Sequence, residues 1–195
     1  DLKTISIFFH FYPFLPHFTP VILGVLGSDK LVTPTNAVLT EVFTGVKPDK
    51  VVVLAEEQPK ADVARLKEVL AVFDLSPEIS VKVLGHGIRA WKEGLREVDM
   101  DLADVTPGRK YMAYAVLEHS RAEEVRYVYL KEESRGYHMF GYVPFSEIKV
   151  YNMRTWEEVP FDPPRTATGL DIKSKLSPEG LTSLINLYSL LGEVE

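Results

Sequence analysis

The chain contains no cysteine. This absence excludes disulfide bonds, a thiol nucleophile and cysteine-ligated metal sites, and it suits a protein of the reducing cytoplasm, the location that we predict. The five histidines show no metal-ligand spacing, so the sequence predicts neither a metal nor another cofactor. The glycine-rich phosphate fingerprints G-x-x-x-x-G-K-[ST] and G-x-G-x-x-G are missing as well.

Charged residues are missing from the beginning of the chain, where no Asp, Glu, Lys or Arg occurs from Thr4 to Ser28. Three prolines interrupt this apolar stretch, and each one removes a backbone hydrogen bond that lipid does not replace. A signal peptide is not indicated, because a basic segment and a small-residue cleavage site are absent. We expect residues 1–19 to form an N-terminal apolar extension without a membrane partner; membrane insertion is the alternative.

The overall composition is that of a folded, acidic protein. The chain has 195 residues, of which 46% are hydrophobic and 26% charged, enough for one large domain or a domain with an appendage. Its formal net charge of −6 argues against sequence-independent binding to duplex DNA, which depends on basic surface. A local basic pocket is compatible with this charge.

Apolar runs and helical patterns alternate along the middle of the chain. Near-continuous apolar or alternating runs predict strands at 20–27, 49–55, 79–85, 101–106 and 124–130, with helices between them. This alternation predicts right-handed βαβ units and hence a Rossmann-like α/β fold, with a largely parallel sheet flanked by helices. The stretches 137–143 and 147–153 predict a closing antiparallel hairpin.

The composition changes after the hairpin. Residues 20–155 are predicted to form the Rossmann-like domain, whereas 156–195 begin with an irregular proline-rich segment. One amphipathic helix is then expected, with Ser177 as its N-cap and Pro178 at its first position. We expect this C-terminal helix to pack on the domain or on a second subunit.

The stretch ADVTPGRKYMAYAV, residues 103–116, places two cations at the beginning of a predicted helix. A cation there is disfavoured by roughly 0.3–1 kcal/mol, because the helix dipole makes that end positive. A bound phosphate would reverse this penalty, since it would interact with Arg109, Lys110, the Thr106 hydroxyl and the free backbone amides. The alternative is that both cations extend into solvent.

The residues of this stretch match a sequence motif of a known protein family. The stretch DVTPGRKYMA resembles the second signature of the CRISPR-associated Rossmann fold family, D-x-T-x-G-x-K-x-M-A. All of its fixed positions are present, namely Asp104, Thr106, Gly108, Lys110, Met112 and Ala113. The first strand and TNAVLTE are similar to the first signature, G-x-S-P followed by V-x-T-E, and the resemblance covers roughly residues 20 to 150. The family serine corresponds to Ser28 or, counted back from Thr40-Glu41, to Thr35.

The resemblance implies a homodimer that binds cyclic tetra-adenylate across its two-fold axis. Family members are ring nucleases or sensors that control a fused or separate effector. Motifs of attached nuclease or DNA-binding effectors are not evident in this sequence, which favours a metal-independent ring nuclease over a sensor. An enzyme that acts on a phosphorylated metabolite is the alternative outside the family.

The resemblance also implies roles for individual residues. Lys110 would neutralise the charge that develops on the phosphate, Arg109 would hold the adjacent phosphate, and Ser28 or Thr35 would orient the attacking 2′-hydroxyl. The expected ligand contacts are Thr106, Gly108, Thr35, Asn36, Gly27, His86 and Glu57. His86 is suited to acid–base chemistry or adenine stacking, although a solvated loop histidine is the simpler interpretation. Glu56 and Glu57 are expected to face solvent, and Trp91 to lie in the core.

Overall fold

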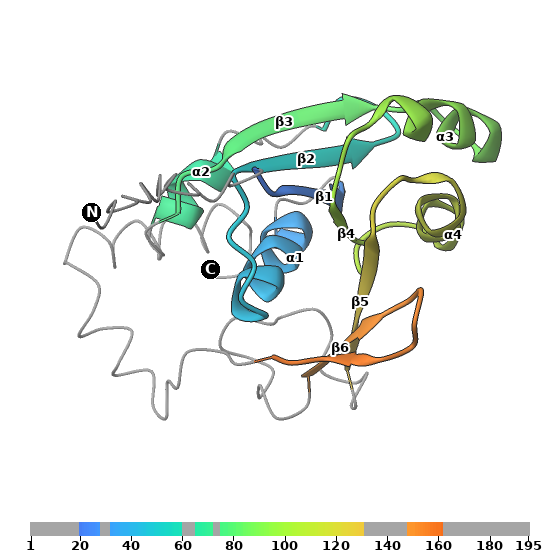
Figure 1. The fold of residues 1–195 in the computed structure, drawn as a ribbon. Helices are drawn as coiled ribbons and strands as arrows, with labels where there is room; N and C mark the ends of the chain where they lie inside the picture. Colours follow the sequence, from blue (N-terminus) through green and yellow to red (C-terminus); the bar gives the residue numbers. More distant parts are fainter. Residues whose placement is uncertain (1–19, 28–31, 60–64, 72–74, 131–147, 162–195) are drawn as a thin grey trace, which may run out of the picture.

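The computed structural model describes residues 20–27, 32–59, 65–71, 75–130 and 148–161. The strands are β1 (Ile22–Leu26), β2 (Lys50–Ala55), β3 (Glu78–Val83), β4 (Leu102–Asp104), β5 (Glu124–Leu130), β6 (Ile148–Asn152) and β7 (Glu158–Val159). The helices are α1 (Val32–Phe43), α2 (Arg65–Ala71), α3 (Ile88–Gly94) and α4 (Lys110–His119), with a short 3₁₀ turn at Leu95–Glu97. In the described residues the strands form one sheet of order β3-β2-β1-β4-β5-β6-β7 (Figure 1).

The sheet confirms the predicted Rossmann-like α/β fold. Strands β3, β2, β1, β4 and β5 are parallel, and β6 and β7 continue the sheet in antiparallel orientation. The expected hairpin strand at 137–143 lies outside the described residues. Among the described strands, β6 pairs with β5 and β7. Strand β7 falls in the segment expected to be irregular, where Glu158 accepts a 2.5 Å hydrogen bond from Lys149 Nζ.

Two helical layers cover the two faces of the parallel sheet. Leu23 and Val25 of β1 pack toward α1 and α2, whereas Leu26 packs toward α3 and α4. Side chains alternate between the faces of a strand, and each face here is apolar, which explains the near-continuous apolar runs in the sequence. Trp91, predicted to be a core residue, is fully buried between α3 and the sheet.

One local expectation was wrong. The stretch TNAVLTEVF predicts a helix that begins near Thr35, but α1 begins at Val32, because Pro34 is tolerated in a first helical turn, where its missing N–H has no intrahelical acceptor. Thr35 therefore belongs to the helix and not to the preceding loop. Ile88 is the first residue of α3 and is 57% exposed. The N-terminal extension and the C-terminal helix lie outside the described residues.

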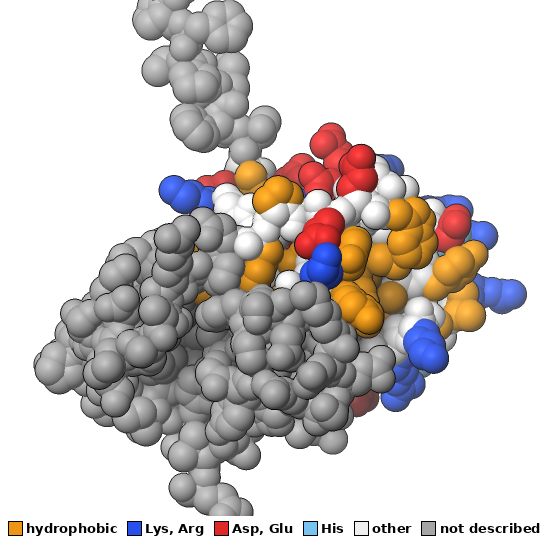
Figure 2. Space-filling model, turned by 90° about the horizontal axis from the view of Figure 1, so that it is seen from below, with side chains coloured by type: hydrophobic (Ala, Val, Ile, Leu, Met, Phe, Trp, Pro, Cys, Tyr) orange, Lys and Arg blue, Asp and Glu red, His pale blue; other side chains and the backbone are white. Residues whose placement is uncertain are grey.

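The described surface mixes residue types. Figure 2 shows hydrophobic side chains interspersed with acidic and basic ones, without a continuous basic surface among the coloured residues. In the part of the chain that the structure describes, no helix combines the length and the apolar character that crossing a bilayer requires.

Candidate functional site

The candidate site lies at the edge where the parallel strands have their carboxyl ends. The strand order changes direction between β1 and β4, since β2 and β3 extend from one side of β1, and β4 and β5 from the other. Ligands of open α/β sheets bind in the crevice at such a switch point. Gly27, the segments 56–59 and 84–87, and the β4–α4 connection at 105–109 are the described parts of this edge.

The β4–α4 connection is a tight turn built around Asp104 and Gly108. Asp104 is 1% exposed, and its Oδ1 accepts a 2.7 Å hydrogen bond from the Thr106 backbone N–H. Gly108 has a φ of +95°, and a Cβ there would lie 3.0 Å from Leu26 Cδ1. Both the backbone conformation and the close approach favour glycine. The turn places Arg109 at the N-cap of α4 and Lys110 at its first position.

The two cations at this helix start have different surroundings. Arg109 Nη1 lies 3.5 Å from Glu56 Oε2, so one of the two charges is compensated by an acidic residue at the end of β2. Lys110 is exposed and makes no ion pair with another described residue. The Arg109 side chain makes no capping bond, and the Arg109 backbone N–H points to Met112 Sδ at 3.4 Å. Of the two cations at the positive end of α4, Arg109 thus has an acidic partner among the described residues and Lys110 does not.

Glu56 is the centre of this cluster, contrary to the expectation that it faces solvent. Its side chain is 12% exposed and accepts a hydrogen bond from the Tyr111 hydroxyl, with His86 Nδ1 3.4 Å away. The hydrogen bond from Tyr111 lowers the pKa of Glu56, and Arg109 lowers it further, against the effect of burial. Glu56 therefore carries its negative charge at neutral pH and orders three side chains around it.

His86 and Glu57 lie at the outer rim of the same cluster. The His86 side chain is 67% exposed and lies between Gly85 and Gly87, which both have positive φ. Glu57 is 64% exposed, as expected, and its Oε2 lies 4.0 Å from His86 Nε2. Trp91 Nε1 donates to the Gly85 carbonyl and supports this loop from the core. The imidazole is thus accessible and close to two carboxylates.

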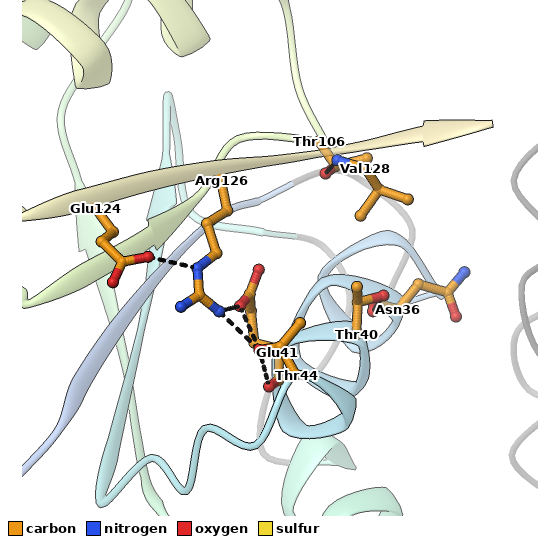
Figure 3. A network of polar contacts seen from close by, with 8 residues as sticks. All are labelled: Asn36, Thr40, Glu41, Thr44, Thr106, Glu124, Arg126 and Val128. Carbon is orange, nitrogen blue, oxygen red and sulfur yellow. Dashed lines mark hydrogen bonds and ion pairs between the residues drawn. The ribbon is translucent and has the colours of Figure 1, made fainter. Parts of the chain in front are cut away.

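The other predicted ligand contacts lie on the α1 side of the β4–α4 connection. The predicted contacts Asn36 and Thr106 line a pocket of about 20 Å³, together with Thr40, which was not predicted. This pocket has room for roughly one water molecule. The Thr106 hydroxyl accepts a 2.9 Å bond from the Val128 N–H and so also supports β5. The position of Asn36 and Thr40 on α1, near Thr106 and Val128, is visible in Figure 3.

The remaining predicted residues are less accessible or not described. Thr35 is 4% exposed on α1. The Gly27 backbone N–H donates to the Leu54 carbonyl at 2.6 Å, as in a continuation of the sheet. Ser28 lies outside the described residues. The structure therefore brings Arg109 together with His86, and Thr106 together with Asn36, on two sides of one turn.

The sequence analysis missed a buried ionic network beneath this turn. Arg126 Nη1 lies 2.6 Å from Glu41 Oε2 and 2.7 Å from the Thr44 hydroxyl, while Arg126 Nε donates to Glu124 at 2.9 Å (Figure 3). Glu41 is fully buried. The available signal was the charged residue inside the apolar helical stretch VLTEVF.

Comparisons with known proteins add a likeness to solved structures. No protein-family model and no curated protein matches the chain. Among solved structures, it is similar to Can2 from Sulfobacillus thermosulfidooxidans in complex with cyclic tetra-adenylate, with 18% sequence identity and a TM-score of 0.49. The match covers 73% of this chain and 37% of the Can2 chain. A match at this level does not extend the ligand or the activity of Can2 to this chain.

A metal site is not formed by the described part of the chain. Among those residues, no group of three or more His, Asp or Glu side chains is placed to hold a metal ion. The described side chains at this edge of the sheet supply cations, an imidazole, carboxylates and hydroxyls.

Proposed function

We propose that the chain is a ring nuclease of the CRISPR-associated Rossmann fold family, which binds cyclic tetra-adenylate across a homodimer and cleaves it without a metal. The observation that carries this proposal is the position of Lys110. It is exposed at the first position of α4, without an acidic partner among the described residues, inside a complete second signature motif. The motif lies at the switch point of the sheet, where a ligand is expected.

The charge arrangement supports an anionic ligand. Lys110 stands at the positive end of α4 without an acidic partner among the described residues, so a bound anion would compensate its charge. A homodimer repeats this arrangement on a two-fold axis, and cyclic tetra-adenylate, with its four phosphates, has a matching symmetry. The net charge of −6 does not oppose such binding, because the local field at the site determines the attraction.

The proposed reaction is an intramolecular transesterification. A ribose 2′-oxygen attacks the adjacent phosphorus, the bond from phosphorus to the 5′-oxygen breaks, and a 2′,3′-cyclic phosphate forms. The 2′-hydroxyl loses its proton and the departing 5′-oxygen gains one. The protein holds the two oxygens in line, and Lys110 stabilises the charge on the phosphorane. The burial of Thr35 favours Ser28 as the residue that orients the 2′-hydroxyl.

Arg109 also lies beside Glu56, and this ion pair affects how Arg109 can bind the ligand. Its guanidinium is close to Glu56, yet its side chain is 70% exposed, so a phosphate can approach from the solvent side. A guanidinium has five N–H donors and can bind Glu56 and a phosphate at once. We therefore assign Arg109 to grip and orient the phosphate next to the one that reacts.

The test is incubation with radiolabelled cyclic tetra-adenylate in EDTA, followed by separation of the products. The wild type is compared with Lys110→Ala and with Lys47→Ala, an exposed lysine at the opposite edge of the sheet. We expect the wild type and Lys47→Ala to release linear products ending in a 2′,3′-cyclic phosphate, and Lys110→Ala to lose at least tenfold in rate.

Other outcomes separate the alternatives. Tight binding of cyclic tetra-adenylate without cleavage of the ring would indicate a sensor rather than a nuclease. Tighter binding of a mononucleotide than of the ring would favour an enzyme of phosphorylated metabolites. Absence of any binding would contradict membership of the family.

A further inference from the structure

Two buried carboxylates meet beneath the candidate site. Glu41 of α1 is 0% exposed and Asp104 at the end of β4 is 1% exposed. Glu41 Oε2 contacts Arg126, and Asp104 Oδ1 accepts the Thr106 N–H. The second oxygen of each group, Glu41 Oε1 and Asp104 Oδ2, is buried without a hydrogen-bond partner among the described residues. Both groups lie beside Arg126, which contacts Glu41 and stands opposite Asp104 in the register of β4 and β5.

The surrounding charges do not balance the pair if both groups are ionised. Arg126 stands beside Asp104 in the register of β4 and β5 and contributes the one positive charge among the described groups that interact with the pair. Arg126 also binds Glu124 on β5, whose side chain is 44% exposed and therefore solvated. Strand β1, the other neighbour of β4, carries no charged residue. Two close, buried carboxylates beside one cation do not both ionise.

We propose that Glu41 and Asp104 share one proton, and that this proton couples α1 to the β4–α4 connection. A proton between Glu41 Oε1 and Asp104 Oδ2 gives both orphaned oxygens a partner. It leaves one negative charge opposite Arg126. Since Asp104 also holds the Thr106 N–H, Glu41 becomes a positioning residue for the turn that carries Arg109 and Lys110.

The direction of the titration follows from the same contacts. Burial, followed by the charge of Asp104, raises the pKa of Glu41 from 4.5 to about 8, against the effect of Arg126. Burial also raises the pKa of Asp104. Between pH 4.5 and 8 the folded state therefore binds more protons than the unfolded state, and stability falls as pH rises through this window. One extra proton corresponds to a tenfold change in the unfolding equilibrium per pH unit.

The first test compares Glu41→Gln with the wild type in urea denaturation at pH 6, 7 and 8. Glutamine keeps the size of the side chain, donates to Asp104 and accepts from Arg126, but has no proton to lose. We expect the wild-type unfolding constant to rise close to tenfold from pH 6 to 7 and about fivefold from pH 7 to 8, where the folded state begins to lose the proton. This rise should be largely lost in Glu41→Gln. The control Glu124→Gln removes a carboxylate from the same arginine and should keep the wild-type slope. Equal slopes in Glu41→Gln and wild type would overturn the shared proton.

A measurement on the wild type does not depend on how the variants fold. Carboxyl ¹³C NMR should show one glutamate resonance that titrates near pH 8 and disappears in Glu41→Gln. If no carboxyl resonance titrates above pH 6, the proposal is wrong.

The coupling to the ligand rests on the proposed function and is tested separately. The affinity for cyclic tetra-adenylate should fall between pH 7 and 9 in the wild type and less in Glu41→Gln. If the NMR titration is present and no ring binds at any pH, the shared proton stands and the proposed function fails. If the ring binds with the same pH dependence in both proteins, the proposed function stands and the coupling is wrong.

Discussion

The β4–α4 connection separates two carboxylate–arginine pairs that behave in opposite ways. On the α1 side, Glu41 contacts Arg126 at 2.6 Å and is fully buried. On the α4 side, Glu56 lies 3.5 Å from Arg109, which is 70% exposed. The pKa of Glu41 is raised to about 8, whereas the pKa of Glu56 is lowered. Glu41, which lies closer to its arginine than Glu56 does, is thus the weaker acid of the two.

The difference shows that the remaining neighbours, rather than the arginine, decide the charge of each group. Glu41 lacks contact with water and faces a second carboxylate, so both effects favour its protonated form. Glu56 accepts a hydrogen bond from Tyr111, which favours its charged form. The buried pair therefore holds the framework of the turn, and the rim pair provides a permanent charge next to the candidate ligand site.

The largest expected effect comes from removing the buried cation. Arg126→Met leaves Glu41 and Asp104 without a counter-charge and should lower the free energy of unfolding at pH 7 by about 3–5 kcal/mol. Arg109→Met removes the rim cation and should cost less than about 1 kcal/mol, because exposed ion pairs contribute little. Urea denaturation of both variants makes the comparison. Equal losses would show that burial does not distinguish the two pairs.

A smaller effect is expected at the turn between the two regions. Gly108→Ala should destabilise the protein by about 1–3 kcal/mol, because alanine disfavours a φ of +95° and its Cβ would contact Leu26. Gly45→Ala is the matched control, since Gly45 has a φ of +96° and no atom within 4 Å of an added Cβ. Thermal unfolding should show a greater loss for Gly108→Ala. A loss no greater than that of Gly45→Ala would contradict the close packing of the turn.

The smallest effect concerns the donor that keeps Glu56 charged. Tyr111→Phe should move the pKa of Glu56 up toward its ordinary value of 4.5 and reduce stability at pH 7 by about 1 kcal/mol. A lowered pKa contributes stability above the ordinary value and loses it as pH falls through the folded value, so the stability difference should shrink in acid. NMR titration of Glu56 provides the measurement. Tyr114→Phe, on the exposed side of α4, should leave that pKa unchanged.

Much of the fold follows from local sequence patterns, and less of the site does. Buried strands such as β2 can be predicted because VVVLA is apolar at consecutive positions, as a sheet covered on both faces requires. The turn before α4 can also be predicted, since Pro107-Gly108 and the cations are adjacent in the chain. The burial of Glu56 cannot be predicted in this way, because its main donor, Tyr111, is 55 residues away and only the folded sheet brings the two together.

The buried network illustrates the same limit. Glu41 is recognisable as a charge within an apolar helix, but its partner Arg126 lies 85 residues further along and its neighbour Asp104 on a different strand. The sequence of β5 alternates, and alternation alone does not indicate whether Arg126 or Tyr127 faces the core. The apolar face of α1 packs against the sheet, and this packing determines that Arg126, rather than Tyr127, faces the core.

Calorimetric titration of the protein with cyclic tetra-adenylate at pH 7 in EDTA, below the proposed loss of the shared proton, tests the central claim most directly. A site formed by two copies of the Lys110 turn predicts saturation at one ring for two chains. It also predicts loss of the binding heat in Lys110→Ala and its retention in Lys47→Ala. Saturation at one ring per chain, or unchanged binding by Lys110→Ala, would contradict a ring site built on this turn.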